Sequence, residues 1–352
     1  MRKATAAVTA TAAVLLAGAV AVDAAAESVP LAAGFDFSAP RTAAEGLEVP
    51  WGLTWLPNGD ALVAERMTAR LLRLPADGGA QVVAGVVPGV SPVGEAGLLG
   101  LAVSPDEWVY AYLTSASDNR IVRFRLDAIG APQTILTGIP RGSIHAGGRI
   151  AFGPDGKLYA GAGDAGTTAN AQNPASLGGK ILRLNPDGSV PADNPISGSP
   201  VYSLGHRNVQ GLAWDAAGRL YAAEFGQNTW DEVNLITPGA NYGWPVVEGV
   251  GGDPRYVDPL VVWSTAEASP SGAVISGSTL YIAALRGTRL WTVPLTASGG
   301  VGTPSAVLQN QFGRLRTVAT GPDGHLWITT SNRDGRGSPS PADDRVLRFP
   351  PA

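Results

Sequence analysis

The stretch GPDGKLYAGAGD at residues 153–164 decides the fold, because a close copy, GPDGHLWITTSN, recurs at residues 321–332. Each copy begins with a Pro-Asp-Gly turn, in which glycine supplies the positive φ that a tight hairpin needs. Each copy then continues into an apolar run rich in residues that favour β-strands. A chain that uses one turn-and-strand unit twice is a candidate repeat protein, and further copies would give the number of repeats.

Related turn-and-strand segments occur six times, and each is followed by a second strand. The turn-and-strand segments are LPNGDALVAE (56–65), SPDEWVYAYL (104–113), GPDGKLYAGA (153–162), DAAGRLYAAE (215–224), SGSTLYIAAL (276–285) and GPDGHLWITT (321–330). The strands that follow are RLLRL (70–74), RIVRFRL (120–126), KILRLN (180–185), DEVNLI (231–236), RLWTVPL (289–295) and RVLRFP (345–350). Consecutive copies begin 45 to 62 residues apart.

A repeat of this length, with three or four strands in each unit, is typical of a β-propeller. Most copies are also preceded by a short strand, such as WGLTWL or LLGLAV. We therefore predict an all-β fold, a six-bladed β-propeller with four-stranded blades, in which Phe35–Leu47 supplies an outer strand that closes the ring. The alternative is a β-sandwich with fortuitous internal similarity, which six copies of one pattern disfavour.

The N-terminus has the order of a secretory signal peptide. Arg2 and Lys3 precede an apolar run from Ala6 to Val22, which ends in small residues. We predict that residues 1–26 are a cleaved signal peptide and that residues 27–352 form a single propeller domain, secreted or periplasmic. The apolar run is shorter than the roughly 20 residues of a membrane span. No stable membrane insertion is therefore expected after cleavage, and an uncleaved anchor is the alternative.

Composition excludes several classes of function. The formal net charge of −4 gives no basic footprint for nucleic acid, and the absence of cysteine excludes a disulfide or a lipid-anchored cysteine. The motif GAGDAG at residues 161–166 matches a dinucleotide-binding fingerprint. The following TTANAQNP is not expected to form the helix that such a site requires, which disfavours a nicotinamide dinucleotide.

Polar residues interrupt four of the repeats just before the first strand, where a structural repeat needs only apolar and turn residues. These segments are GEAGLLG (94–100), IHAGGRI (144–150), GHRNVQGL (205–212) and GRLRTV (313–318). Because the first strand of each blade lies beside the channel, we expect their side chains to converge on one polar, mainly cationic pocket. The expected members are Glu95, His145, Arg207, Asn208, Arg314 and Arg316, with Arg286 from the fifth repeat.

Each of these residues also has an ordinary structural interpretation. His145 could form a hydrogen bond within the core, Glu95 could be a solvated loop carboxylate, and arginines near strand ends are usually surface groups. Their equivalent positions in several repeats favour a shared site. His206 alternates to the opposite face from Arg207, which favours a structural role. His325 lies in a hairpin turn and is expected to be solvated.

The chain resembles the soluble pyrroloquinoline quinone (PQQ)-dependent aldose sugar dehydrogenases, relatives of soluble glucose dehydrogenase. The resemblance runs from VPWGLTWLPNGDALVAER through HAGGRIAFGPDGKLY and GHRNVQGL to GRLRTVATGPDG. It implies a six-bladed propeller that oxidises aldose sugars at the anomeric hydroxyl to lactones by hydride transfer to the quinone. It also implies that His145 is the general base and that Arg207 polarises a quinone oxygen. The implied cofactor contacts are Glu95, His145, Arg207, Asn208, Arg286, Arg314 and Arg316.

The same resemblance implies two calcium sites. In EFGQNTWDEVNLI, the backbone carbonyls of Gly226 and Gln227 match those that hold a Ca²⁺ ion at the quinone. Glu232 and Tyr242 match a second, structural calcium site, and oxygen ligands of this kind are the ones that calcium prefers. Without the resemblance, Asp231 and Glu232 would be interpreted as an acidic turn.

Three positions depart from the family pattern. Val209 replaces a proline, Ile144 replaces the carboxylate of the glucose-oxidising relatives, and Glu95 replaces their glutamine. We therefore expect a broad aldose dehydrogenase with an open site, which passes electrons to an acceptor that the sequence does not identify. The enzymatic alternative is a calcium-dependent sugar lactonase, which would need carboxylates and Asn at the channel centre. The non-enzymatic alternative is a propeller that binds carbohydrate or protein.

Overall fold

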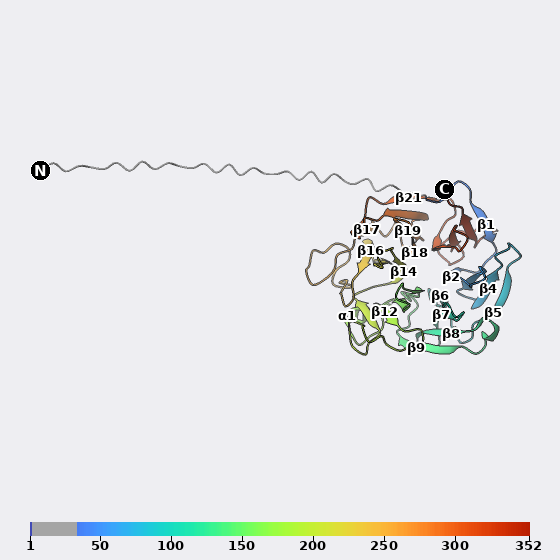
Figure 1. Ribbon diagram of the computed structural model, residues 1–352, viewed down its shortest axis with the longest axis horizontal. Coiled ribbons are helices and arrows are strands. Elements are labelled where there is room, and N and C mark those ends of the chain that lie inside the picture. Colours follow the sequence, from blue (N-terminus) through green and yellow to red (C-terminus); the bar gives the residue numbers. More distant parts are fainter. Residues whose placement is uncertain (2–33) are drawn as a thin grey trace. The chain divides into compact units, whose positions relative to one another are not determined.

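The computed structural model describes Met1 and residues 34–352. Except for Met1, the predicted signal peptide lies outside the described residues. The described residues form 24 strands, one helix of a single turn, and one 3₁₀ turn at Leu126–Ala128. The strands make six antiparallel sheets of four strands each. Figure 1 shows these sheets arranged around a common centre. The predicted six-bladed β-propeller is confirmed.

The first three blades follow the chain in order, from the innermost strand to the outermost. Blade one contains β2 (Pro50–Trp55), β3 (Ala61–Glu65), β4 (Arg70–Leu74) and β5 (Val82–Val86). Blade two contains β6 (Leu98–Val103), β7 (Val109–Thr114), β8 (Asn119–Phe124) and β9 (Gln133–Ile139). Blade three contains β10 (Ile150–Phe152), β11 (Leu158–Ala162), β12 (Lys180–Leu184) and β13 (Val201–Leu204).

The last three blades repeat this arrangement, except that the chain's first strand completes blade six. Blade four contains β14 (Val209–Trp214), β15 (Leu220–Glu224), β16 (Trp230–Ile236) and β17 (Val261–Ser264). Blade five contains β18 (Pro270–Ser276), β19 (Thr279–Ala284), β20 (Arg289–Pro294) and β21 (Ser305–Val307). Blade six contains β22 (Leu315–Thr320), β23 (Leu326–Thr330), β24 (Val346–Phe349) and β1 (Arg41–Ala44).

The ring is closed by β1, as the sequence predicted for Phe35–Leu47. Strand β1 pairs antiparallel with β24, with Arg41 opposite Arg348 and Thr42 opposite Leu347. Blade six therefore joins a segment from near the start of the described chain to three strands from its end. This hydrogen-bonded seam covers an edge of blade six that would otherwise be unpaired.

The apolar core is divided among the contacts between neighbouring blades. The buried side chains of the described residues form six clusters, and each cluster consists mainly of residues from one adjacent pair of blades. Tyr110 of blade two packs with Leu158 of blade three, and Leu53 of blade one packs with Trp327 of blade six. Because burial of apolar surface is the main favourable term in folding, each blade is stabilised chiefly by its two neighbours.

One secondary-structure prediction was wrong. In TTANAQNP, residues Ala169–Gln172 form the helix α1, where no helix was expected. The helix is a single turn, and Ala171 is its only buried residue. Four residues give too few apolar positions to show a helical period in the sequence. Among the described residues, no helix is long and apolar enough to cross a membrane.

Candidate active site

A cavity of about 530 Å³ brings most of the predicted site residues together. Because neighbouring strands are antiparallel, residues that enter a blade's first strand lie at the same end as residues that leave its second strand. The cavity wall contains Glu95, His145, Arg207, Asn208, Gly226, Gln227, Arg286 and Arg314. Arg316 instead lines an adjoining cavity of about 190 Å³, which shares Glu95, Phe225 and Arg336 with the larger one.

His145 is held on two sides in the loop that precedes β10. Its backbone N–H donates to Glu95 Oε2 at 2.9 Å, and its ring Nδ1 lies 2.7 Å from Asp164 Oδ1. The backbone of His145 has a φ of +52°, in the left-handed region that few non-glycine residues occupy. No hydrogen bond between described residues reaches Nε2, so this nitrogen is available at the cavity wall.

Asp164 is the buried partner of His145. It also accepts hydrogen bonds from the Trp244 indole at 2.8 Å and from the backbone of Gly166 at 2.7 Å. Burial alone would raise the pKa of Asp164, but the His145 contact and the other hydrogen bonds outweigh it, and the pKa is lowered. The residue is therefore a carboxylate and an acceptor for His145 Nδ1, so a neutral imidazole here carries its proton on Nδ1 and its free lone pair on Nε2.

The glycines of GAGDAG serve this contact. A Cβ added at Gly163 would lie only 1.8 Å from the backbone oxygen of His145. Glycine at this position therefore lets the chain bring Asp164 close to the histidine loop. The motif is explained by backbone packing rather than by phosphate binding.

Arg207 and Asn208 enter β14 with unpaired donors. Arg207 donates from its guanidinium to Phe225 O at 3.2 Å and lies over the Trp244 ring, 5.4 Å from its centroid. Asn208 is fully buried, and its side-chain oxygen accepts from Gly147 N at 3.0 Å. Among the described residues, no acceptor lies within hydrogen-bond distance of Arg207 Nε or Asn208 Nδ2. Buried donors of this kind carry a free-energy cost that a ligand with acceptor atoms would relieve.

Arg314 and Arg316 share one carboxylate, Asp334. The Arg314 guanidinium lies 3.0 Å from Asp334 Oδ2, and the Arg316 guanidinium lies 3.4 Å from the same oxygen. Burial alone would raise the pKa of Asp334, but the positive charges of Arg316 and Arg314 lower it by more, so the pKa is below its usual value. The interpretation of these arginines as surface groups was wrong, because both are more than nine-tenths buried.

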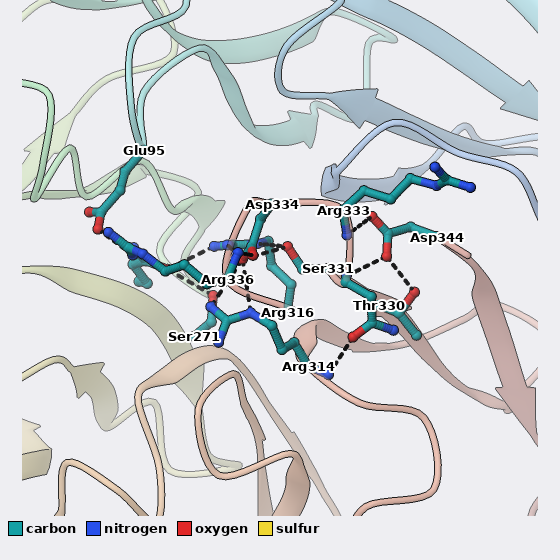
Figure 2. A network of polar contacts seen from close by, with 12 residues as sticks. Glu95, Ser271, Arg314, Arg316, Thr330, Ser331, Arg333, Asp334, Arg336 and Asp344 are labelled. Carbon is teal, nitrogen blue, oxygen red and sulfur yellow. Dashed lines mark hydrogen bonds and ion pairs between the residues drawn. The ribbon is translucent and has the colours of Figure 1, made fainter. Parts of the chain in front are cut away.

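Glu95 is paired with an arginine from a different blade. Its Oε1 lies 2.7 Å from Arg336, which belongs to the loop between β23 and β24. Figure 2 shows Glu95 reaching this loop from its own blade, close to Asp334, Arg314 and Arg316. The Glu95 side chain is mostly buried, which excludes its interpretation as a solvated loop carboxylate. Arg286 lines the larger cavity and is exposed.

The loop of Gly226 and Gln227 is held by two carboxylates. Asp231 accepts from Gly226 N at 2.8 Å, and one oxygen of Glu248 accepts from the backbone N–H groups of residues 227–230 at 2.7 to 3.1 Å. Burial raises the pKa of Asp231 to about 6. No hydrogen bond between described residues reaches the carbonyl oxygens of Gly226 and Gln227. Both carbonyls thus keep their lone pairs for another ligand.

Glu232 and Tyr242 lie apart from the large cavity. They line a hollow of about 10 Å³ with Glu224 and Glu248, room for about one water-sized particle. Burial and the Glu224 carboxylate raise the pKa of Glu232. The alternative of an acidic turn was wrong, because Asp231 and Glu232 are buried within β16.

Tyr242 can offer a metal its backbone carbonyl oxygen but not its hydroxyl. Its hydroxyl donates to Leu235 O at 2.7 Å and accepts from Thr237 N, so the available oxygen is its backbone carbonyl. Among the described residues, no group of three or more His, Cys, Asp or Glu side chains is arranged to hold a metal ion. Any calcium site here would therefore depend on backbone carbonyls in addition to carboxylates.

The other two histidines are outside the cavity wall. His206 is fully buried, with Nδ1 2.8 Å from Glu224 Oε2 and Nε2 2.8 Å from Ser203 Oγ, which confirms a structural position. His325 was expected to be solvated, but its side chain is only 20% exposed and lies against Asp323 in the turn. The turn folds the imidazole onto the neighbouring carboxylate instead of releasing it to solvent.

Comparison with known proteins places the chain in a family. The family model described as glucose/sorbosone dehydrogenase matches residues 47–339. The chain belongs to this dehydrogenase family. A solved structure, the PQQ-bound form of aldose sugar dehydrogenase from Streptomyces coelicolor, has 55% sequence identity and a TM-score of 0.85, and the match covers 88% of this chain and 96% of that one.

Two curated relatives support the same assignment to the dehydrogenase family. The aldose sugar dehydrogenase YliI of Escherichia coli is 27% identical, and the match covers 82% of this chain and 89% of that protein. Quinoprotein glucose dehydrogenase B of Acinetobacter calcoaceticus is 35% identical, and the match covers 60% of this chain and 53% of that protein. The family is thus one of sugar dehydrogenases, and its members include quinoproteins.

Sequence reasoning missed several residues of this dehydrogenase-family site. Asp164, Trp244, Glu248, Asp334 and Arg336 all contact the predicted residues or line a cavity. For Asp164 a signal was present, because it lies just beyond Gly163 after the second strand of its blade, and Glu224 ends the second strand of the next. Trp244, Glu248, Asp334 and Arg336 lie in loops whose lengths differ between blades. These four residues therefore have no equivalent position in the other repeats from which they could be predicted.

Proposed function

We propose that this protein is a PQQ-dependent aldose dehydrogenase that oxidises the anomeric hydroxyl of aldose sugars to give lactones. The observation that carries the proposal is the contact between His145 and the buried Asp164 at the wall of an arginine-rich cavity. The names of the relatives, aldose sugar dehydrogenase and quinoprotein glucose dehydrogenase, support it. The proposal rests on the membership of this chain in a sugar dehydrogenase family.

The residues present fit the quinone. PQQ carries three carboxylates, and arginine forms strong charge-assisted hydrogen bonds with such groups. Arg207, Arg286 and Arg314 line the larger cavity, whose volume of about 530 Å³ is in the usual range for cofactor sites. The unpaired donors of Arg207 and Asn208 would gain acceptors from it. Arg316, beside the smaller cavity, adds positive charge.

The protein's contribution to the reaction is a positioned base. When bound, the quinone supplies the oxidant, which takes a hydride from the anomeric carbon. His145 Nε2 accepts the proton of the anomeric hydroxyl, because Nδ1 already carries a proton directed at Asp164. The Asp164 carboxylate then stabilises the positive charge that His145 acquires. Arg207 would donate a hydrogen bond to a quinone oxygen and so stabilise the negative charge that develops there.

Calcium fits the same proposal. The carbonyls of Gly226 and Gln227 are hard oxygen ligands held in place by Asp231 and Glu248. A calcium ion at this loop would supply Lewis-acid polarisation. Glu232 and the backbone carbonyl of Tyr242 would hold a second, structural ion, whose charge would relieve the repulsion between Glu232 and Glu224.

Substrate range and location complete the proposal. Ile144 lines the cavity and is 39% exposed, and it offers no hydrogen bond to a sugar hydroxyl. We therefore propose a broad range of aldoses rather than tight glucose specificity. The enzyme would act after export, and it would pass electrons to an acceptor outside the propeller.

The proposed function predicts a double cofactor requirement. Purified protein, first treated with a chelator, is expected to oxidise aldoses in a dye-linked assay only when PQQ and Ca²⁺ are both supplied. The quinone is the oxidant, and the ion acts as its Lewis acid and clamp. Each component is omitted in turn as the control. Activity that needs neither, or that appears with a nicotinamide cofactor instead, would contradict the proposal.

Calcium is also expected to stabilise the protein without quinone. An ion that binds only the folded state raises the melting temperature as its concentration increases. The Glu232→Gln variant is expected to lose much of this increase, because it removes a charged ligand and the repulsion that the ion relieves. Differential scanning calorimetry with chelator or with Ca²⁺ measures both proteins. Equal calcium-dependent shifts in wild type and variant would exclude Glu232 as a ligand.

A further inference from the structure

The ion pair between Glu95 and Arg336 divides the two cavities. Glu95, Arg336 and Phe225 line both the larger and the smaller cavity. Glu95 comes from the loop before β6 in blade two, and Arg336 comes from the loop between β23 and β24 in blade six. The pair therefore bridges two non-adjacent blades where an anion would bind.

Glu95 brings a negative charge to a site that otherwise favours anions. Its carboxylate holds the backbone N–H of His145, so it cannot move away without releasing that loop. Its second oxygen is bound by Arg336 at 2.7 Å. A neutral amide oxygen could accept the same hydrogen bond from His145 N, so the bond itself does not need a charge. Because Glu95 is charged and lies beside an anion-binding cavity, its charge requires a compensating cation.

The backbone of Arg336 is held through Asp334 by two buried arginines, Arg314 and Arg316. Its backbone N–H donates to Asp334 Oδ1 at 2.9 Å, while Asp334 Oδ2 contacts Arg314 and Arg316. The loop that carries Arg336 is thus anchored on the two buried arginines, as Figure 2 shows. The Arg336 side chain itself is 57% exposed, so its replacement leaves the core intact.

We propose that Arg336 is a positioning residue that neutralises Glu95, so that a carboxylate can hold the His145 loop inside an anion-binding site. This inference rests on the proposed function, because it takes PQQ as the anion. Its distinctive consequence is that Arg336 matters only while residue 95 is charged. A residue that gripped the cofactor directly would matter in either case.

The test is a double-mutant cycle on cofactor affinity. Equilibrium titration of chelator-treated protein with PQQ and excess Ca²⁺, followed by tryptophan fluorescence quenching, gives Kd without any turnover. Arg336→Gln is expected to weaken binding about 10- to 100-fold, because it leaves the Glu95 charge uncompensated beside an anion. Glu95→Gln is expected to bind at least as tightly as wild type. The double variant is expected to return to within about threefold of wild type, because the repulsion has gone.

The control is Arg120→Gln, which breaks a comparable ion pair with Asp118 at 2.6 Å on blade two, away from both cavities. It is expected to leave Kd unchanged. A double variant that stays as weak as Arg336→Gln would overturn the inference and assign Arg336 to direct cofactor contact. An Arg336→Gln variant with wild-type affinity would overturn it as well. Wild-type protein that binds no PQQ would overturn both the inference and the proposed function.

Discussion

Replacement of His145 by glutamine is expected to lower aldose turnover by about 10²- to 10⁴-fold, the usual effect of losing a general base. Glutamine keeps a polar side chain in the same loop but cannot accept the proton at neutral pH. The substitution removes no positive charge that pairs with a PQQ carboxylate, so PQQ binding is expected to change little. Turnover by the dye-linked assay and Kd by fluorescence titration are measured on the same preparations.

The matched control for this variant is His325→Gln, an identical substitution in the hairpin turn between β22 and β23. That turn lies at the opposite end of its blade from the cavity, and the control is expected to turn over like wild type. Near-normal turnover of His145→Gln, with bound quinone confirmed by its absorbance, would show that the histidine is structural. Glu95 would then be the next base to test.

Replacement of Arg207 by alanine is expected to impair both turnover and cofactor binding. Loss of a donor to developing negative charge lowers turnover by about 10²- to 10³-fold. Loss of a charge-assisted hydrogen bond also weakens PQQ binding by about 10- to 100-fold. His145→Gln and Arg207→Ala therefore differ in Kd even if their turnover falls equally, and titration beside the activity assay separates the two roles.

Arg219→Ala is the control for this variant, because Arg219 lies in the turn between β14 and β15 and pairs with Asp215. It is expected to keep wild-type turnover and affinity. The melting temperature of the apo protein identifies any loss of folding, since Arg207 also contacts Phe225 and Trp244. A well-folded Arg207→Ala variant with unchanged Kd would remove Arg207 from the cofactor contacts.

The inner three strands of each blade could be predicted from sequence, and the outermost strands could not. Strands such as β3 and β11 are fully buried, so their residues must be apolar and the repeat is visible. Strands such as β5 and β9 are half exposed at the rim, where burial imposes no alternation of residue types. Only β1 was expected in advance among the outer strands, because a closed ring requires a strand for blade six.

The candidate site was predictable where a repeat position carried an unusual residue type. His145, Arg207 and Arg314 stand out because they precede a first strand. The residues that hold them were harder to find, although one rule connects some of them. Glu65 at the end of β3 accepts from Glu48 N at 2.9 Å, and Glu224 at the end of β15 accepts in the same way from the backbone N–H of Arg207. An acidic residue that ends the second strand thus supports the residue entering the first strand, a signal visible in the sequence.

The remaining contacts depend on loops that have no counterpart in the other blades. Arg336 and Asp334 occupy the long connection between β23 and β24, and Glu248 lies in the connection between β16 and β17. Their partners are fixed only when different blades come together, as for Glu95 and Arg336. No spacing along one blade could therefore have predicted them.

The closure of the ring by β1 and β24 has a mechanical consequence. The cavity wall takes side chains from blades two, three, four, five and six, and none of these blades alone holds enough of them to bind an anion. A ligand in this cavity would therefore contact five blades at once. Without the ligand, a blade that unfolds loses only its apolar contacts with its two neighbours. With the ligand bound, the same unfolding also breaks contacts with the ligand, so unfolding of the loaded protein is expected to be more cooperative.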